Sequence, residues 1–146
     1  MPKISITDFF ASLDAPLNNH VWSWGALTQN KKEVILRVWR DEKRKINGKT
    51  HFRLTLHSLF DKSQGQISPG YPERLEHLQI AHQKGRAFLV YCRAADQTVQ
   101  PRTIAGYTDH VLGVCESIVI DDEGDYWGEE TRTIRVEEFE ALMSSR

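Results

Sequence analysis

The feature that most constrains this fold is a strand pattern followed by a strong turn signal. The segment VILRVW (residues 34–39) alternates apolar side chains with a mixed set, which predicts a strand with one apolar and one mixed face. The pair Asn47-Gly48 is a favoured two-residue hairpin turn, and residues 51–60 alternate again beyond it. The sequence therefore predicts a β-hairpin in this third of the chain.

Such a hairpin would gather aromatic and cationic side chains on one surface. Side chains at every second position of a strand leave the same face. The surface expected from this rule is a two-stranded platform that carries Arg37, Trp39, Arg53, His51 and His57. It is the best candidate binding surface in the first half of the chain.

The rest of the chain predicts further short strands and about three short helices. Helices are expected over residues 5–13, from near Pro72 to a C-cap at Gly85, and over residues 137–143; strands are expected at 87–92, 110–120 and 126–136, with an acidic turn at 121–125. The longest helix is expected to bury a stripe of Tyr71, Leu75, Leu78 and His82. With 146 residues, 40% of them hydrophobic, we expect one domain spanning residues 1–146.

The net charge of -1 hides a lopsided distribution of charge along the chain. Residues 31–49 hold eight Lys or Arg against three acids, whereas residues 116–140 hold ten acids against two arginines. A local basic segment is sufficient for contact with a polyanion, because electrostatic attraction is screened within about 10 Å. The alternative is that the two segments are solvated surface or complement each other.

Known catalytic and metal-binding patterns are missing. The six histidines and two cysteines show no zinc spacing and no HExxH, and the chain has no GxSxG or phosphate-binding loop. Residues 121–130 lack the regular spacing of a calcium loop. Contiguous acids at 121–123 suit a turn better than a nuclease metal site. We expect no metal, no cofactor and no catalytic residues.

The compartment is read from the cysteines and from hydropathy. Cys92 and Cys115 lie in apolar runs, where a thiol behaves as a small buried hydrophobe. No run of about 18 apolar residues and no signal peptide is visible. The sequence predicts a cytoplasmic protein that is neither exported nor inserted in a membrane.

The tryptophans allow two interpretations. Trp22 and Trp24 are two positions apart, so in an extended segment both rings leave one face, and Trp39 follows on the mixed face of the next strand. Packing in the core is the default role of such rings. Rings interleaved with Arg37 and Arg53 would also suit stacking on bases with contacts to phosphates.

The second half of the chain carries a family resemblance. GRAFLVYCRA (85–94), then RTIAGYTDHVLGVCESIVIDDEGDYW (102–127) and RTIRV (132–136), resemble the PUA-like superfamily, small β-barrels that include the EVE, YTH, ASCH and SRA domains. The resemblance implies an aromatic-walled base pocket at the barrel mouth. It places Trp22, Ser23 and Trp24 on an early pocket strand and Tyr91 and Arg93 on a later one. Residues 34–60 are more elaborate than in the smallest members, and the acidic third would repel phosphates.

The sequence thus predicts an α+β protein, a PUA-like mixed β-barrel flanked by about three short helices. It would bind DNA or RNA without catalysis and hold a flipped or unpaired base, including a modified one, between aromatic rings. The residues expected to contact the nucleic-acid backbone are Arg37, Arg40, Lys43, Arg44 and Arg53. Bacterial defence or RNA handling would suit this activity, with a nuclease on another chain as a candidate partner.

Two other functions stay open. One is a small enzyme that acts on a nucleotide-like metabolite or on RNA, for which His51, Asp109 and Glu116 are weak candidates. The other is a protein-interaction module that uses the acidic C-terminal face and has purely structural tryptophans.

Overall fold

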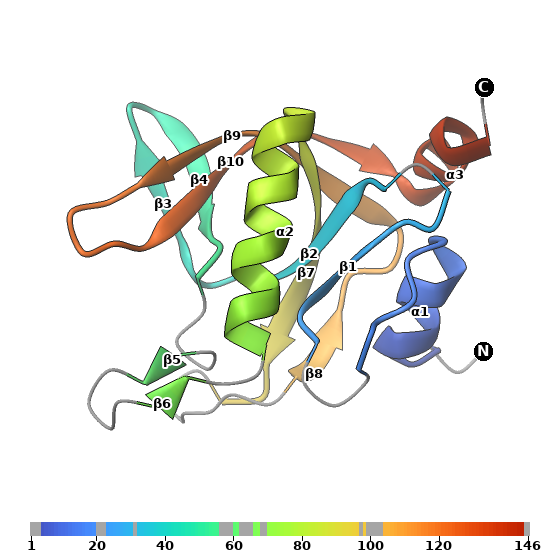
Figure 1. Cartoon of the computed structure of the whole chain (residues 1–146), viewed down its shortest axis with the longest axis horizontal. Helices are drawn as coiled ribbons and strands as arrows, with labels where there is room; N and C mark the ends of the chain where they lie inside the picture. The colour runs from blue at the N-terminus through green and yellow to red at the C-terminus, as the bar shows by residue number, and fades with distance from the viewer. Residues whose placement is uncertain are drawn as a thin grey trace.

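The computed structural model (Figure 1) describes residues 4–19, 23–30, 32–55, 60–61, 66–67, 70–96, 98 and 104–144. In chain order the elements are α1 (Ile6–Ser12), β1 (Gly25–Leu27), β2 (Val34–Trp39), β3 (Lys43–Ile46), β4 (Lys49–Arg53), β5 (Phe60–Asp61), β6 (Gln66–Ile67), α2 (Gly70–Lys84), β7 (Ala87–Ala94), β8 (Ile104–Tyr107), β9 (Val111–Ile120), β10 (Tyr126–Arg135) and α3 (Val136–Ser144).

One mixed sheet organises the molecule. Its strand order is β1-β2-β7-β9-β10-β4-β3, with β8 paired to β7. The pair β2 and β7 is parallel, and the other pairs are antiparallel. The expected α+β class is confirmed, with three helices in the described part of the chain. No pairing between described residues joins β1 to β3, so the sheet is open at these two ends and is not a closed barrel.

The sheet has a core on each face. One core contains Phe9, Trp39, Phe88 and Phe139 and lies under α1 and α3. The other contains Leu36, Leu54, Leu78 and Leu89 and lies under α2. Figure 1 shows α2 crossing the front of the sheet, with α1 and α3 together at one side.

The Asn47-Gly48 turn forms as predicted. Both residues have the positive φ that this turn requires, 53° at Asn47 and 78° at Gly48. The strand before the turn, however, is β3, and the register pairs Lys43 with Phe52 and Ile46 with Lys49. The turn therefore connects an exposed strand at the edge of the sheet to β4.

The predicted two-stranded platform is wrong. Strand β2 lies between β1 and β7, and all six of its residues are buried, which is typical of an inner strand covered on both faces. The backbone turns directly after β2, where Glu42 N donates to Trp39 O at 3.1 Å. Arg37 and Trp39 are thus on a different strand pair from His51 and Arg53. His57 lies outside the described residues.

The predicted end of the longest helix is confirmed. Gly85 has φ 80°, and its N–H donates to Ala81 O at 2.9 Å. The predicted stripe is confirmed at Leu78, which is buried, and at Leu75, which packs against the core. It is wrong at His82, which is exposed, and the side chain of Tyr71 lies outside the described residues. The stripe also missed the buried Arg74, His77 and Ala81. In the described part of the chain no helix has the length and apolar character needed to cross a membrane.

Candidate ligand site at the carboxyl end of the parallel strands

The parallel pair β2 and β7 ends at one edge of the molecule. Arg37 pairs with Val90 and Trp39 with Cys92, so both strands finish together. Helix α2 packs against β1 and β2, and in Figure 1 it begins at the lower end of the view, the end toward which the arrowhead of β7 points. In open sheets, ligands are commonly bound outside the carboxyl ends of parallel strands. This edge is therefore the candidate ligand site.

Trp24 lies at this edge, immediately before β1. The guanidinium carbon of Arg37 is 4.2 Å from the centroid of the Trp24 ring, and Arg37 Nη1 donates to Ser23 O at 3.0 Å. The ring of Trp39 lies 5.2 Å from that of Trp24 at an interplanar angle of 59°. Arg37 and Trp39 hold the indole of Trp24 in one orientation, a geometry that favours a cation–π contact.

The tryptophans of this region differ in exposure. Trp39 is only 1% exposed, so it packs in the core and is not the open pocket wall that the sequence suggested. Trp24 is partly exposed. Trp22 lies outside the described residues. Trp24 is thus the predicted base-stacking tryptophan that retains accessible surface in the described part of the chain.

Arg74 fixes the backbone around this stack. From the start of α2 its guanidinium donates to Trp24 O at 2.6 Å, to Arg37 O at 2.9 Å and to Leu54 O at 3.1 Å. Arg74 is 1% exposed, and burial lowers its pKa to about 9, with the charge of Arg37 adding to the effect. Burial also lowers the pKa of Arg37. One buried side chain therefore ties α2 to both partners of the stack.

Polar groups border the stack. Glu73, beside Arg74, accepts hydrogen bonds from Asn18 Nδ2 at 3.0 Å and from Ser23 Oγ at 3.2 Å. His77, one turn further along α2, is buried, and its Nδ1 has no hydrogen-bond partner. Burial, together with the charge of Arg74, lowers the pKa of His77 to about 4, so its ring is neutral at pH 7.

Tyr91 does not share a pocket with the tryptophans. It belongs to the core under α2, whereas Trp24 and Trp39 pack on the opposite face. Its hydroxyl donates to Glu130, and burial, with this carboxylate, raises the pKa of Tyr91. The hydroxyl also lies against Gly113, where an added Cβ would come within 2.1 Å of it. The predicted common wall of Trp24 and Tyr91 is therefore absent.

The exposed cations at this edge are a smaller set than predicted. Arg40 follows β2, and its N–H donates to Cys92 O at 2.9 Å, which brings it next to Arg93 at the end of β7. Arg40 and Arg93 are exposed; Lys43 is also exposed, but it starts β3 in the β3–β4 hairpin. Arg37 was predicted as a backbone contact, but it is only 8% exposed because it lies under Trp24.

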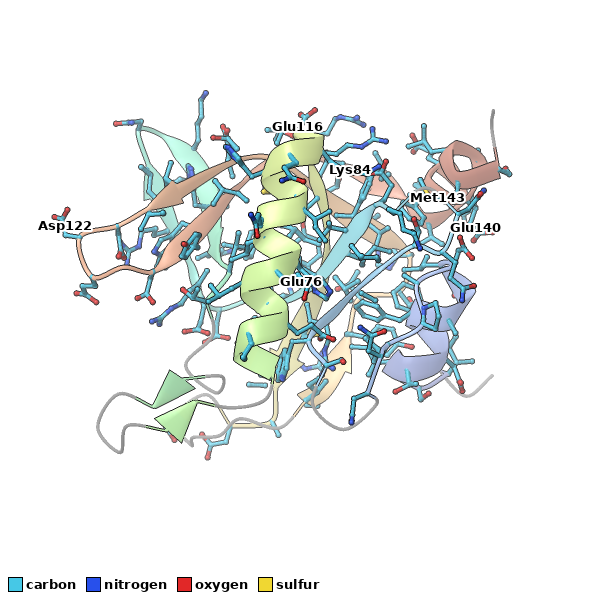
Figure 2. The ribbon with its side chains drawn as sticks, in the orientation of Figure 1. Glu76, Lys84, Glu116, Asp122, Glu140 and Met143 are labelled. Carbon is cyan, nitrogen blue, oxygen red and sulfur yellow. The ribbon has the colours of Figure 1, made fainter. Side chains whose placement is uncertain are left out.

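The remaining predicted backbone contacts pair with acids. We call residues 41–53 together with 117–129 the charged arm, because the basic β3–β4 hairpin lies beside the acidic turn of β9 and β10. Arg53 bonds Asp125 at 2.7 Å and Glu42 at 3.3 Å, and Arg44 lies 3.8 Å from Asp121. Figure 2 shows Asp122 at the tip of this arm. The two charged segments thus complement each other, which was the second interpretation of the sequence.

A separate cavity of about 270 Å³ lies at the other end of α2. Its lining is Ala81, His82, Gly85, Arg86, Ala87, Cys115, Glu116, Ser117 and Ile118. Burial raises the pKa of Cys115 to about 11, so its thiol is a poor nucleophile. Figure 2 places Glu116 beside the last turn of the helix.

The weak catalytic candidates do not converge. His51 is buried on β4 with its Nδ1 2.9 Å from Lys49 O, whereas Glu116 on β9 accepts from Thr131 Oγ1 at 2.8 Å. Asp109 is exposed beside His110 in the turn before β9. Among the residues whose placement is described, no three metal-binding side chains are grouped together.

Arg74 and Glu73 are the site residues that the sequence did not reveal. A hydropathy stripe assigns arginine and glutamate to the solvent side of a helix, and nothing local marks a buried guanidinium. The proximity of Glu73 to Asn18 and Ser23, 55 and 50 residues away, could have come only from the fold. Comparisons with protein-family models, with curated proteins and with solved structures found no match to this chain.

Proposed function

We propose that this protein binds nucleic acid without chemically changing it, and that a flipped or unpaired base stacks on Trp24. The observation that carries the proposal is the partly exposed Trp24 ring, held by Arg37 at 4.2 Å at the carboxyl end of the parallel strands. Every base has a π-face, and stacking on an aromatic side chain contributes about 1 to 3 kcal/mol per base. A single ring therefore gives modest affinity.

The polar border supports recognition of a base edge. Ser23, Asn18 and the carboxylate of Glu73 form one hydrogen-bonded group beside the ring. A carboxylate can accept from the exocyclic amine of a base, as acidic side chains do with cytosine. Glu73 is the residue that would distinguish an amine-bearing base from one that has only acceptors at the same position.

Phosphate contacts come from the two exposed cations that follow the parallel pairing of β2 and β7, Arg40 and Arg93. Lys43, Arg44 and Arg53 belong to the charged arm, where Arg44 and Arg53 pair with acids. With two phosphate contacts, the logarithm of the affinity for a single strand should fall with the logarithm of the salt concentration with a slope of about -1.4.

A PUA-like origin remains part of this proposal. Helix α2, the C-cap at Gly85 and the inner strand β7 follow one another in the order that suggested the resemblance. The mixed sheet with one parallel pair is compatible with a member whose barrel is incompletely closed. The elaborated segment between β2 and α2 is the main departure.

The test compares two variants that each remove an indole stacked with an arginine. Trp24→Ala removes the proposed stacking ring, and Trp127→Ala is the matched control, because Arg44 covers the Trp127 ring at 3.8 Å. Short fluorescent DNA and RNA strands are titrated by anisotropy at several salt concentrations, after thermal melts show that both variants are folded. We expect Trp24→Ala to weaken binding about 5- to 100-fold. Equal affinity of wild type and Trp24→Ala would end the proposal.

A further inference from the structure

The edge with Trp24 carries an excess of buried positive charge. Arg37 and Arg74 are 8% and 1% exposed. Arg74 also lies close to the first turn of α2, where the helix dipole disfavours a cation. Three positive contributions, two guanidinium groups and a helix N-terminus, thus meet here, and among the described residues Glu73 is the carboxylate whose charge opposes that of Arg74. Such an arrangement is unfavourable without an anion.

The hydrogen bonds of these arginines do not neutralise them. Arg37 donates to a main-chain carbonyl and is hydrogen-bonded to the Cys92 thiol, and Arg74 donates to three main-chain carbonyls. A carbonyl satisfies a donor but has no net charge, and a buried ion remains costly without a counter-charge. In the described part of the chain, the Nε atoms of Arg37 and Arg74 are buried without a hydrogen-bond partner, a feature that they share with Arg53 of the charged arm. Donor capacity is therefore left over beside the stack.

Other partly buried cations of this chain are balanced by acids. Arg86 donates two hydrogen bonds to Glu33, at 3.1 and 3.0 Å, and Arg53 contacts two carboxylates. Among the described residues, neither Arg37 nor Arg74 forms a salt bridge. Glu73 lies near Arg74, but its Oε2 accepts from Asn18 and Ser23. The two buried arginines without a salt bridge therefore lie at the edge where the ligand is proposed to bind.

We propose that the Arg37–Arg74 centre binds the phosphate group attached to the base that stacks on Trp24. The inference rests on the proposed function and names the part of the nucleotide that this centre takes. Arg37 makes the contact, because its guanidinium lies 4.2 Å from the centroid of the ring on which the base stacks. Arg74 acts through it, since it holds Arg37 O at 2.9 Å and adds its charge. Phosphate suits a guanidinium as a multidentate acceptor.

The experiment uses three small probes with the full chain. They are a nucleoside, its 5′-monophosphate, and a dinucleotide with one internal phosphodiester, each titrated by calorimetry at constant ionic strength. Inorganic phosphate, against an equal ionic strength of chloride, is a fourth arm read by thermal shift. We expect the 5′-monophosphate or the dinucleotide to bind about tenfold more tightly than the nucleoside. Tighter binding of the 5′-monophosphate would indicate that the centre takes a terminal phosphate. Tighter binding of the dinucleotide would indicate a backbone phosphodiester.

Variants assign the gain to this centre. The ratio of the affinity for the phosphate-bearing probe to the affinity for the nucleoside should fall to about one in Arg37→Met. In Arg37→Lys this ratio should be partly kept. Arg44→Met is the matched control and should keep the full gain, because Arg44 belongs to the charged arm. Should Arg37→Met fail to fold, the comparison of the probes on wild type still decides.

The outcomes separate this inference from the proposed function. If all three probes bind wild type equally, the phosphate site is wrong and base stacking stands. If no nucleoside or nucleotide binds but inorganic phosphate stabilises the protein, the anion site stands and the proposed function falls. If phosphate neither tightens binding nor stabilises the fold, the inference is overturned. A gain that persists in Arg37→Met also overturns it.

Discussion

In the part of the chain that the structure describes, arginines cover two tryptophans, and the two stacks differ in how the arginine is neutralised. In the charged arm, Arg44 lies 3.8 Å from the centroid of Trp127, whose Nε1 donates to Asp121 at 3.0 Å. Asp121 is also within 3.8 Å of Arg44. At the other stack, Arg37 covers Trp24 and donates a hydrogen bond to the main-chain carbonyl of Ser23. The same pair of side chains thus occurs with and without a carboxylate.

The presence or absence of the carboxylate indicates which stack has a structural role and which binds a ligand. In the Trp127 stack a carboxylate balances the charge of the arginine, so this stack stabilises the structure of the arm. The Trp24 stack leaves positive charge buried at the end of two parallel strands without a carboxylate partner. Energetically unfavourable local arrangements of this kind are commonly found at functional sites. Changes at the Trp24 end should therefore affect both stability and binding, whereas changes in the arm should affect stability alone.

The largest expected effect is from Arg74→Met. The variant removes the donors of Trp24 O, Arg37 O and Leu54 O, and unsatisfied buried acceptors are costly. We expect the free energy of unfolding in urea to fall by about 3 to 5 kcal/mol. Oligonucleotide binding should weaken as well, because the backbone of both stack partners loses its anchor.

The matched change in the arm is Arg53→Met. Arg53 bonds Asp125 and Glu42, which are partly exposed and can be solvated when the guanidinium is lost. We expect a loss of about 1 to 2 kcal/mol with binding unchanged. A larger loss for Arg53→Met than for Arg74→Met would break the comparison between the two regions.

Local chemistry in the sequence predicted the turns and helix ends of this fold. Asn47-Gly48 and Gly85 occupy the positive-φ positions that their residue types favour, and Ser5 caps α1 by accepting from Asp8 N at 3.1 Å. Each of these depends on a few neighbouring residues. Signals of this kind are legible in one sequence because the interactions are within a single turn.

Partners distant in the sequence could not be predicted in the same way. Strand β2 pairs with β7, some 50 residues later, and not with the strand after the turn. The alternation of VILRVW was interpreted as one apolar and one mixed face, but burial on both faces needs two separate cores. Of the predicted site, Trp24 and Ser23 stay together, whereas Tyr91 faces the other core. Arg74 could be found only from three acceptors on three different segments.

The next effect is a pH dependence at the Trp24 end. The pKa of His77 is lowered from 6.5 to about 4 in the folded state. Between these values the unfolded chain binds a proton that the folded chain does not, so stability is lost as the pH falls below 6.5. The contribution approaches about 1.4 kcal/mol per pH unit in that window.

His77→Gln should remove this dependence. Urea unfolding of the two proteins at pH 7, 6, 5 and 4.5 measures it as the difference between their slopes. In addition, NMR titration of His77 in Arg74→Lys should still show a lowered pKa, because the burial of His77 and the positive charge that opposes imidazolium are both kept. Parallel stability curves for wild type and His77→Gln would count against the assigned cause.

A smaller effect tests the assignment of the two sheet faces. Tyr91→Phe removes the hydroxyl that donates to Glu130, a half-buried carboxylate. We expect a loss of about 1 to 2 kcal/mol in thermal or urea unfolding. Nucleotide affinity should stay within twofold, since Tyr91 packs under α2 on the face opposite Trp24. If a folded Tyr91→Phe variant bound nucleotide more weakly than wild type, Tyr91 would have to belong to the ligand site.

The smallest expected effect is from Arg44→Met in the charged arm. Half of the Arg44 side chain is exposed, so its contact with Trp127 should contribute about 0.5 to 1 kcal/mol. Methionine keeps apolar cover on the ring, and the loss should therefore come mainly from charge and shrink as salt rises. Melting temperatures of wild type and Arg44→Met, in low and in 1 M salt, measure this. A difference that does not narrow in high salt would mean that packing holds the arm together, and the contrast with the Trp24 end would then rest on burial instead of charge.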